Sequence, residues 1–440
     1  MSHRATPASP SSPPAAPPQR LRLRVAVLGA GTVGGEFLRQ AGSHPGAEIV
    51  SVLVRRGQAA RPAHVAGAPL ATDPGAALAS RPDVVVDALP GAEAARPVVE
   101  AALAAGIRTV TANKDLMAAH GPALRRLARA SGASLDVEAC VGGAVPVVAA
   151  LRARRGDPLL SLHAVANATS TFILERLERG EPLPLALRAA QEAGVAEPDP
   201  RDDLSGADLA RKLRVLALEA GILPEECPWA QLQERWSGLA EEAAHGAAEA
   251  RRRGLRLRLV GSLRRGPEGG WRASTGLRLV AAESALGSVR GAECAFVLRH
   301  RDAGELVLRG IGAGPAPTAA TLWGEVLRGP SAGWPAPAGA PEAAAPETAA
   351  PDAEAPHARE RLLVTGVSAD AALPPECAHG LRLISFERRR RRVVAALERV
   401  ETAADAPSGL LAWIQAAGLR DARWYPAGDE VAARRLAWPA

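Results

Sequence analysis

The stretch RLRVAVLGAGTVGGEFLRQ, residues 22–40, decides the fold of this chain. Its first half is a short apolar run, typical of a buried strand, and it leads directly into Gly29, Gly31 and Gly34, spaced G-x-G-x-x-G. In this motif the first glycine makes a tight turn, the second lets a pyrophosphate approach the backbone, and the third lets the following helix pack closely on the strand. The stretch therefore predicts dinucleotide binding; the alternative is a glycine-rich turn without a ligand.

The residues that follow alternate between strand-like and helix-like patterns. We expect strands at Glu48–Val54, Asp83–Asp87 and Thr109–Thr111, and Ala-rich helices at Ala94–Ala104 and Gly121–Ser131. Strands that alternate with helices of this length form parallel sheets with right-handed crossovers. Residues 21–142 are therefore predicted to form an α/β, Rossmann-like nucleotide-binding domain.

A second region, residues 143–300, has separate runs of helices and strands. The expected helices are Thr171–Arg179, Leu183–Ala193 and Gly206–Ala220, and the expected strands are Leu255–Leu263, Trp271–Val280 and Cys294–Arg299. Runs of strands beside separate helices predict an α+β domain. Residues 301–330 are expected to return to the nucleotide-binding domain.

Three further segments differ in composition. Residues 1–20 and 331–357 are rich in Pro and Ala, and we predict a disordered arm and an extended linker. Residues 358–440 are expected to form a small α+β region, with strands at Arg361–Val367, Leu381–Phe386 and Val393–Val400 and a helix near Leu410–Ala417. The arginine run Arg388–Arg392 favours a solvated hairpin or a partner-facing edge over a nucleic-acid patch, because no aromatic residues are interleaved with it.

Composition excludes several classes of protein. The net charge of +6 is spread along a chain with 47 acids, which favours a mixed surface over a nucleic-acid or membrane partner. Cys140, Cys227, Cys294 and Cys377 lie far apart, which argues against a zinc site and a disulfide framework. No apolar run reaches the roughly 20 residues of a membrane span, and residues 1–20 lack the apolar stretch of a signal peptide. We therefore expect a cytoplasmic protein.

Lysine is rare in this chain. Lys and Arg total 53 residues, but Lys114 and Lys212 are the only lysines in the sequence. Arg cannot exchange a proton near neutral pH, whereas Lys can once burial or a neighbouring charge lowers its pKa. The two lysines are therefore candidates for acid–base chemistry; the alternative is that they are chance survivors of a biased composition.

Lys212 lies near the end of an acidic segment, GVAEPDPRDDLSGADLARKL at residues 194–213. Its carboxylates are Glu197, Asp199, Asp202, Asp203 and Asp208. Ser205 is expected to cap the helix that carries Asp208 and Lys212, which are spaced i,i+4 on one helix face. Acids beside one amine fit a pocket for a cationic substrate group with one proton carrier. The alternative is a surface ion pair of little energetic weight.

The residues after the second expected strand bear on the choice of cofactor. About 20 residues after the glycine motif, many NAD-binding domains carry an acid that holds the ribose 2′-OH. Here Val54, Arg55 and Arg56 occupy that place. Two guanidinium groups suit a 2′-phosphate, so NADP is favoured and NAD stays possible. The alternative is surface charge in an Arg-rich chain.

Five segments together resemble the homoserine dehydrogenase family. They are TANKDLMAAHG (111–121), LDVEACVGGAVPVV (135–148), NATSTFIL (167–174), AEPDPRDDLSGADLARKL (196–213) and GIGAGPAPTAA (310–320). They occur in the family's order and at its spacing, over about residues 22–328. The resemblance implies NAD(P)-dependent interconversion of L-aspartate 4-semialdehyde and L-homoserine, in threonine, methionine and isoleucine biosynthesis. It also implies a homodimer or homotetramer in which residues 143–300 bind substrate and dimerise.

The resemblance also implies roles for individual residues. Lys212 matches the lysine that gives a proton to the carbonyl oxygen, and Lys114 matches a lysine near nicotinamide and substrate. Asp208 matches an acid that holds substrate, Glu197 matches the glutamate that binds the substrate's amino group, and Asp203 matches another acid of that pocket. The motif and the resemblance together place the cofactor at Gly29, Ala30, Gly31, Thr32, Val33, Gly34, Arg55, Lys114, Gly312 and Gly314. A monovalent cation, usually sodium, is implied at Glu138 and the carbonyls of Val141, Gly143 and Val145; oxygen ligands suit a hard cation.

The chain departs from the family's pattern in three places. The family often has Gly-Thr-Thr-Asn-Tyr where this chain has Ala168-Thr169-Ser170-Thr171-Phe172. Residues 87–91 read DALPG, where many members have a polar or Gly-rich loop against the cofactor. Residues 358–440 lack the Asp-Lys-Pro-Gly-like turn of an ACT regulatory domain, so inhibition by threonine is not assumed. A degenerate ACT-like module, a dimer contact and a tether all remain open for this region.

Rival functions remain at the level of sequence. One is a catalytically weak homologue that acts as a regulatory subunit; Lys114, Glu197, Asp208 and Lys212 argue against it. Another is a Rossmann dehydrogenase for a different amino-acid aldehyde, which the acid cluster does not exclude. A third is an Arg-rich nucleic-acid binder, which would bind DNA or RNA with a steep salt dependence.

Overall fold

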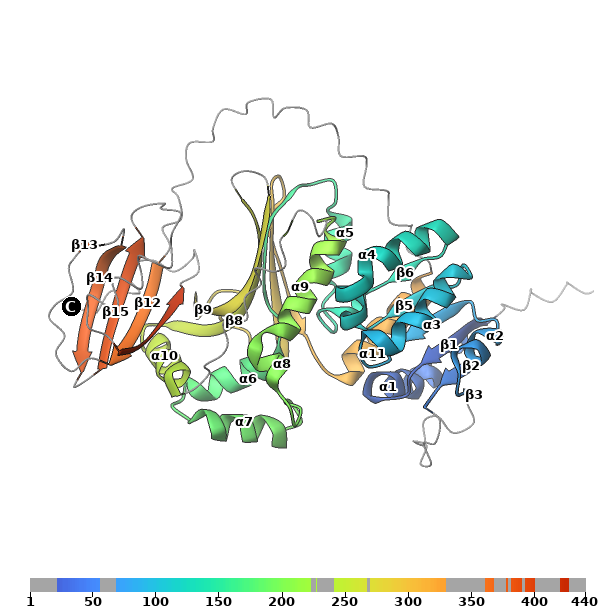
Figure 1. Cartoon of the computed structure of the whole chain (residues 1–440), viewed down its shortest axis with the longest axis horizontal. Coiled ribbons are helices and arrows are strands. Elements are labelled where there is room, and N and C mark those ends of the chain that lie inside the picture. The colour runs from blue at the N-terminus through green and yellow to red at the C-terminus, as the bar shows by residue number, and fades with distance from the viewer. Residues whose placement is uncertain are drawn as a thin grey trace, which may run out of the picture.

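The computed structural model describes the greater part of the chain, and three sheets follow one another along it (Figure 1). The described residues are 22–55, 69–222, 227, 241–266 and 270–329, with strands at 361–367, 377–378, 381–389, 392–399 and 420–426. The predicted arm, the predicted linker, the helix near Leu410–Ala417 and the side chain of Arg56 lie outside these residues.

Six parallel strands form the first sheet, in the order β3-β2-β1-β4-β5-β6. They are β1 (Leu23–Leu28), β2 (Ala47–Leu53), β3 (Leu70–Ala71), β4 (Val84–Asp87), β5 (Arg108–Thr111) and β6 (Leu135–Asp136). This is the strand order of a doubly wound nucleotide-binding fold, whose order reverses between β1 and β4. The predicted Rossmann-like domain is confirmed, and its ligand crevice is expected at the carboxyl ends of these two strands.

Helices cover both faces of this sheet. They are α1 (Thr32–Gln40), η1 (Ala41–Ser43), α2 (Pro74–Ala79), α3 (Ala92–Ala104), α4 (Lys114–Ser131) and α11 (Pro315–Arg328). Helix α4 begins at Lys114 and not at the predicted Gly121, because the Asn113 side chain caps it and Pro122 is accommodated inside it. The chain returns to this sheet at α11, where Trp323 stacks on Phe37 of α1 with ring centroids 4.1 Å apart.

The second sheet is antiparallel, in the order β11-β10-β7-β8-β9. Its strands are β7 (Leu159–Val165), β8 (Leu255–Arg265), β9 (Trp271–Ala281), β10 (Glu293–His300) and β11 (Gly304–Ile311). The accompanying helices are η3 (Glu138–Cys140), α5 (Val147–Ala153), α6 (Ala168–Leu177), α7 (Leu183–Glu192), α8 (Arg201–Ser205), α9 (Ala207–Glu219) and α10 (Glu241–Arg252). The predicted α+β architecture is confirmed, although strands β7 and β11 and helices η3, α5, α8 and α10 were not predicted. The domain limits predicted at residues 142, 300 and 330 stay predictions.

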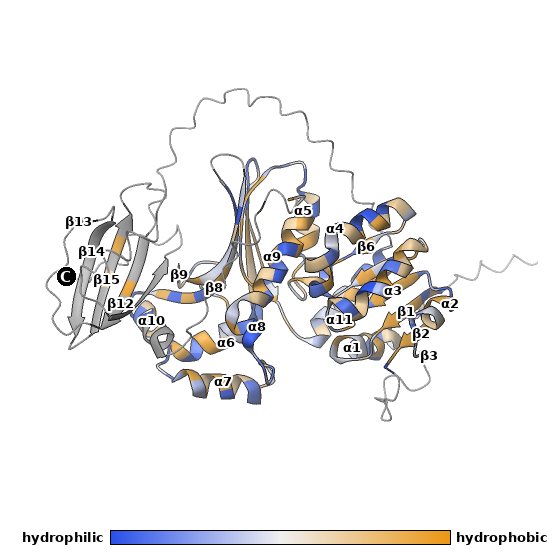
Figure 2. Cartoon of the chain, in the orientation of Figure 1, coloured by the Kyte–Doolittle hydropathy of each residue, from blue (hydrophilic) through white to orange (hydrophobic). Residues whose placement is uncertain are grey.

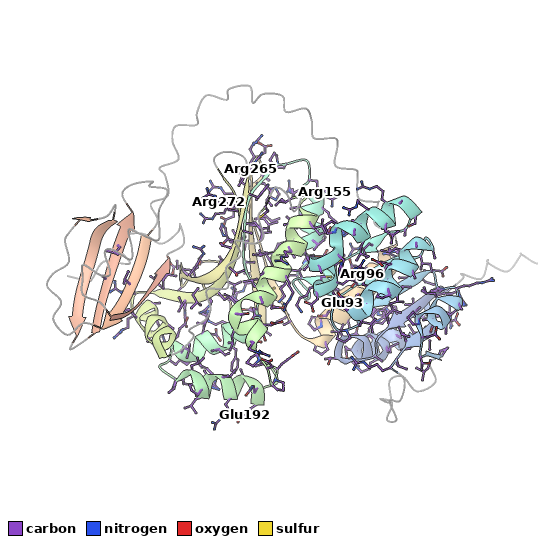
Figure 3. All side chains as sticks on the ribbon, in the orientation of Figure 1. Glu93, Arg96, Arg155, Glu192, Arg265 and Arg272 are labelled. Atoms are coloured by element: carbon purple, nitrogen blue, oxygen red, sulfur yellow. The ribbon has the colours of Figure 1, made fainter. Side chains whose placement is uncertain are left out.

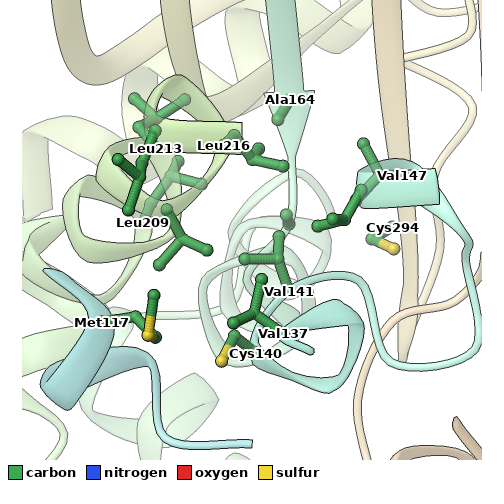
Figure 4. Packing of buried hydrophobic residues seen from close by; sticks show 14 of the residues in the cluster. Met117, Val137, Cys140, Val141, Val147, Ala164, Leu209, Leu213, Leu216 and Cys294 are labelled. Atoms are coloured by element: carbon green, nitrogen blue, oxygen red, sulfur yellow. The ribbon is translucent and has the colours of Figure 1, made fainter. Parts of the chain in front are cut away.

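One hydrophobic core joins the two sheets. Figure 2 shows hydrophobic residues along the central strands of the first sheet, where Ala26 and Leu28 of β1 are fully buried in this core. Figure 4 shows Met117 of α4 facing the leucines of α9, with Ala164 of β7 in the same cluster. Helices α4 and α9 therefore pack together across the boundary between the two regions.

The third sheet has the order β13-β14-β15-β12-β16 and is antiparallel. Its strands are β12 (Arg361–Val367), β13 (Cys377–Ala378), β14 (Leu381–Arg389), β15 (Arg392–Arg399) and β16 (Arg420–Pro426). The three predicted strands are confirmed, and Arg389 pairs with Arg392 as expected of a hairpin. The order β14-β15-β12-β16 is that of the sheet in ferredoxin-like folds.

Charged side chains are spread over different elements. Figure 3 shows Glu93 on α3, Glu192 at the end of α7, and Arg265 and Arg272 on the hairpin of β8 and β9.

In the part of the chain that the structure describes, no helix is both long enough and apolar enough to cross a bilayer.

Candidate active site

The two lysines of the chain meet at one carboxylate. Asp208 lies in the first turn of α9, is 7% exposed, and has one oxygen 3.4 Å from Lys114 Nζ and the other 2.7 Å from Lys212 Nζ. Lys212 follows on the same helix face, and Lys114 is the first residue of α4. The packing of α4 against α9 therefore brings together two lysines that are far apart in sequence.

The charges of this cluster stabilise one another. Burial opposes ionisation of Asp208, but Lys212 and Lys114 outweigh it and hold the pKa of Asp208 well below its usual range. Burial alone would lower the pKa of Lys114, but the carboxylates of Asp208 and Asp115 raise it. Near neutral pH the site therefore contains one carboxylate between two amines, and the carboxylate is ionised.

Asn167 links this cluster to the acidic segment, and it was not predicted as a site residue. Its Nδ2 donates to Asp203 (2.7 Å) and to Asp208 (2.9 Å), while its Oδ1 caps α6 by accepting from the Ser170 N–H. Lys212 Nζ donates to the carbonyl of Ala166 (2.6 Å), the residue before Asn167. In NATSTFIL, Asn167 could be recognised as a helix cap, because Asn is a preferred N-cap residue. The sequence gives no sign of its bonds to Asp203 and Asp208.

The rest of the acidic segment is more open. Asp203 is joined to the cluster through Asn167, whereas Glu197 is exposed and its backbone carbonyl accepts from Gln191 Nε2 (3.4 Å). Arg211 pairs with Asp115 of α4 (2.8 Å) and with Asp202, so it ties this segment to the nucleotide-binding region.

The predicted cap of α9 is wrong in detail. The N-cap of this helix is Gly206, with φ of +79°, and not Ser205, which ends α8. The Ser205 hydroxyl still accepts a hydrogen bond from the Ala207 N–H (3.3 Å). A left-handed residue is needed between two abutting helices, and glycine adopts it without strain.

The glycine loop has the shape that a pyrophosphate needs. A Cβ on Gly34 would lie 2.0 Å from the Gly29 carbonyl oxygen, which explains the close packing of α1 on β1. Gly31, the exposed N-cap of α1, has nothing within 4 Å of its Cβ position. The open space in front of Gly31 fits a dinucleotide phosphate at the helix N-terminus. Ala30, Thr32 and Val33 lie in the same turn, and Arg55 is exposed just after β2.

A late glycine turn, residues 312–314, lies against the segment that follows η3. A Cβ on Gly312 would lie 2.5 Å from Cys294, and one on Gly143 would lie 2.7 Å from the carbonyl carbon of Gly312. Gly314, with φ of +118°, is the N-cap of α11. The turn therefore leads from the edge of the second sheet to a helix that packs on the first.

Three of the four groups expected to hold a cation, Glu138, Gly143 and Val145, already accept hydrogen bonds. The Glu138 carboxylate accepts from the Val148 N–H (2.8 Å) and the Ala149 N–H (2.7 Å) at the start of α5, and burial raises its pKa. The Gly143 carbonyl accepts from the Thr321 hydroxyl (2.7 Å), and the Val145 carbonyl accepts from the Val147 N–H (2.8 Å). Each of these oxygens has a second lone pair, so an all-oxygen set remains compatible with a weakly charged cation.

A cavity of about 540 Å³ lies elsewhere, at the amino-terminal edge of the first sheet. It is lined by the starts of β1, β4 and β5, including Leu23, Asp83 and Arg108. Because ligands of open α/β sheets bind at the carboxyl ends of the strands, we do not assign the cofactor to this cavity.

Comparisons with known proteins agree with the geometry. The family model described as "Homoserine dehydrogenase, NAD binding domain" matches residues 29–138, and "Homoserine dehydrogenase" matches residues 146–327. The homoserine dehydrogenases of Corynebacterium glutamicum and Pseudomonas aeruginosa are 33% and 31% identical, over 69% of this chain and 71% of each relative. A homoserine dehydrogenase structure from Thiobacillus denitrificans covers 93% of this chain and 98% of its own, with a TM-score of 0.76 and 25% identity. This chain belongs to the homoserine dehydrogenase family.

Proposed function

We propose that this protein interconverts L-aspartate 4-semialdehyde and L-homoserine with NADP as its redox cofactor. The observation that carries the proposal is the buried Asp208 carboxylate between Lys114 and Lys212, with the glycine loop of the same molecule shaped for a dinucleotide. Family membership supplies the reaction class, an NAD(P)-dependent oxidation of a CH–OH group or its reverse.

Lys212 is proposed to supply the proton of the reduction. When bound, NADPH provides the hydride that reaches the carbonyl carbon of the substrate. Lys212 then gives a proton to the carbonyl oxygen, so that aldehyde, hydride and proton make the alcohol. Two of its three N–H donors meet Asp208 and the Ala166 carbonyl, which leaves one for the substrate oxygen. Solvent returns the proton to the amine.

Asp208 and Lys114 are proposed to assist without exchanging a proton. Asp208 is ionised near neutral pH because its pKa is held below the usual range, so it orients Lys212 and does not act as an acid. Lys114 keeps its charge because its pKa is raised, and a positive charge beside the carbonyl stabilises the developing alkoxide.

Two acids are proposed to bind the ammonium group of the substrate. Asp203 lies beside Asp208 through their shared donor Asn167, and Glu197 is exposed on the same segment. Carboxylates recognise an ammonium group whatever the length of the aldehyde, so a dehydrogenase for another amino-acid aldehyde is the competing proposal.

The preference for NADP is proposed from Arg55. Its exposed guanidinium follows β2, at the position where NAD-specific domains often carry an acid. A similar solved structure, with a TM-score of 0.58 and 24% identity, is described as a hyperthermophilic archaeal homoserine dehydrogenase in complex with NADPH. Both observations support NADP as the cofactor, and Arg55 is the proposed partner of its 2′-phosphate.

A monovalent cation, probed first as sodium, is proposed at the Glu138 oxygens and the carbonyls of Val141, Gly143 and Val145. It would join η3 to the late glycine turn, and we assign it a structural role only. The compatible oxygen chemistry described above supports it.

Location, pathway and assembly are proposals as well. We propose a cytoplasmic enzyme of threonine, methionine and isoleucine biosynthesis that acts as a homodimer or homotetramer. The support for assembly is β11, an edge strand that exposes Val307 (44%) and Ile311 (49%). Exposed apolar side chains on an edge strand favour pairing with another chain.

The decisive test is oxidation of NADPH and NADH, in parallel, with L-aspartate 4-semialdehyde and with a longer amino-acid aldehyde. We expect turnover of the semialdehyde, with kcat/KM for NADPH at least about tenfold above that for NADH. The variant Arg55→Gln should lose most of that preference, whereas Arg39→Gln, an exposed arginine of α1, should keep it. Absence of turnover with both cofactors would contradict the function, and faster turnover of the longer aldehyde would favour the competing proposal.

A further inference from the structure

The loop after β4, residues 88–91, lies directly against the glycine loop. A Cβ on Gly29 would lie 2.9 Å from the Ala88 carbonyl oxygen and 3.3 Å from Leu89 Cδ2. The Ala88 N–H donates to the Leu28 carbonyl at the end of β1 (2.9 Å). Because the strand order reverses between β1 and β4, this loop borders the crevice expected to hold the cofactor.

Asp87 holds this loop from inside the sheet. It is the last residue of β4 and is fully buried. One carboxylate oxygen accepts from the Leu89 N–H (3.0 Å) and the other from the Thr111 hydroxyl (2.8 Å) at the end of β5. Burial raises the pKa of Asp87 to about 6, although both hydrogen bonds favour the charged form. At pH 8 the carboxylate is therefore ionised and accepts both bonds.

Thr111 and Asn113 carry the connection to α4. The Thr111 hydroxyl oxygen accepts from the Asn113 N–H (2.9 Å). Asn113 Oδ1 caps α4 by accepting from the Leu116 N–H (2.9 Å). Asn113 Nδ2 donates back to the carbonyls of Leu89 (3.1 Å) and Gly91 (2.8 Å). The start of α4 and the loop after β4 are therefore fastened to each other.

The residue that this arrangement positions is Lys114. It follows Asn113 directly as the first residue of α4, and its Nζ lies 3.4 Å from Asp208. A one-residue change in the register of α4 would turn the lysine by about 100° around the helix axis, away from Asp208. The cap therefore fixes where the amine stands relative to the glycine loop.

We propose that Asp87, Thr111 and Asn113 form a hydrogen-bond relay that positions Lys114 against the cofactor crevice. Asp87 and Thr111 are positioning residues, because neither touches substrate or the reacting atoms and both act through Asn113 and Lys114. The inference deepens the proposed function, since it rests on Lys114 acting beside the substrate carbonyl.

The sharpest variant is Thr111→Val, which nearly preserves volume and removes only the hydroxyl. Thr109→Val is the matched control, because Thr109 is equally buried, lies on the same face of β5, and donates to the Ile107 carbonyl (3.4 Å), away from the site. At pH 8 we expect Thr111→Val to lower kcat about tenfold while the dissociation constant for NADPH changes less than about threefold. Thr111→Ser keeps the hydroxyl, so its kcat should lie within about threefold of wild type. The kcat of Thr109→Val should lie in the same range.

Hydrogen exchange gives a readout that does not depend on turnover. The amides of Asn113 and Leu116 should exchange faster in Thr111→Val than in Thr109→Val, while those of α9 stay unchanged. Should Thr111→Val lower Tm by more than about 5 °C, Asp87→Asn, which keeps the volume and one acceptor, should show the same loss of kcat.

Three outcomes would overturn the relay: full kcat in Thr111→Val, an equal loss in Thr109→Val, or no recovery in Thr111→Ser. A wild-type protein without turnover of aspartate semialdehyde would contradict the proposed function instead. In that case the hydrogen-exchange comparison still decides whether the relay holds the start of α4.

Discussion

The two halves of the candidate site use different chemical groups of the chain, backbone groups on the nucleotide side and charged side chains on the substrate side. On the nucleotide side the groups that would meet the pyrophosphate of the cofactor belong to the backbone around Gly29, Gly31 and Gly34, and their geometry depends on the absence of side chains at these glycines. On the substrate side the groups are the charged side chains of Asp208 and Lys212, which hold one another. The first half is sensitive to added volume and the second to changed charge or proton affinity.

This difference has a structural origin. The glycine loop lies within one βα unit, so residues close in sequence shape it. The charged cluster combines Lys114 of α4 with Asp208 and Lys212 of α9, and it exists only once the two helices pack. Two kinds of variant therefore test the halves separately. A variant that keeps the charge but cannot release a proton tests the substrate half, and a variant that adds one methyl group tests the nucleotide half.

The largest effect is expected for Lys212→Arg. The substitution keeps the positive charge beside Asp208, but Arg does not release a proton near neutral pH. We expect kcat to fall about a hundredfold, within the usual range for loss of a general acid. Binding of NADPH, measured by fluorescence titration, and the far-UV circular dichroism should stay as in wild type.

Lys114→Arg is the matched variant, because Lys114 is proposed to supply position and charge rather than the proton. It should keep clearly more kcat than Lys212→Arg. If Lys212→Arg retains more than about a tenth of the wild-type kcat, its assigned role is wrong, since general acids contribute more than that.

The next effect concerns two glycines of the nucleotide half. In Gly34→Ala the new methyl would lie 2.0 Å from the Gly29 carbonyl oxygen, so α1 must move away from β1. We expect the free energy of unfolding to fall by roughly 2 kcal/mol, as for other overpacked sites. Gly31→Ala places its methyl in open space and should change stability by less than about 0.5 kcal/mol.

Gly31→Ala should instead weaken NADPH binding by about tenfold, because the methyl occupies the space in which a pyrophosphate approaches the backbone. Urea denaturation and fluorescence titration of both variants measure the two quantities separately. Equal stability of Gly34→Ala and wild type, or unchanged NADPH affinity of Gly31→Ala, would contradict the proposed construction of this half.

The nucleotide half was largely predictable from sequence. A strand, three spaced glycines and a helix are local patterns, and the alternation of strands and helices indicates the parallel sheet. The two lysines were predictable as candidates because composition made them exceptional. Their meeting at Asp208 followed only from the family resemblance and is visible in the packing of α4 on α9.

Other features depend on tertiary contacts that leave little trace in the sequence. Asn167 reads as a helix cap, and its donation to Asp203 and Asp208 requires α6 to face α9. Helix α4, predicted from Gly121, begins at Lys114, because the Asn113 side chain caps it and Pro122 is accommodated inside it. Glu325 reads as an ordinary polar residue of α11, yet it is 2% exposed.

The smallest effect on stability is expected at Glu325. This residue lies where α11 of the nucleotide half contacts η3, a contact that we call the seam. One carboxylate oxygen accepts from the Glu138 N–H (2.9 Å), and the other has no hydrogen-bond donor among the described residues. Burial, reinforced by Asp136, raises the pKa of Glu325 to about 8. The folded state therefore binds this proton more tightly than the unfolded chain, and stability should fall as pH rises from about 4.5 to about 8.

Glu325→Gln removes this titration, because the amide stays neutral and still offers one oxygen to the Glu138 N–H. Relative to wild type, the variant should gain on the order of 1 kcal/mol at pH 9 compared with pH 6, measured by urea denaturation at both pH values. Glu219 is the matched control: it is equally buried, but Arg125 and Arg152 lower its pKa despite burial. Glu219→Gln breaks those pairs and should destabilise at both pH values, without the gain at pH 9. An equal response of the two variants to pH would mean that Glu325 does not hold a proton at the seam.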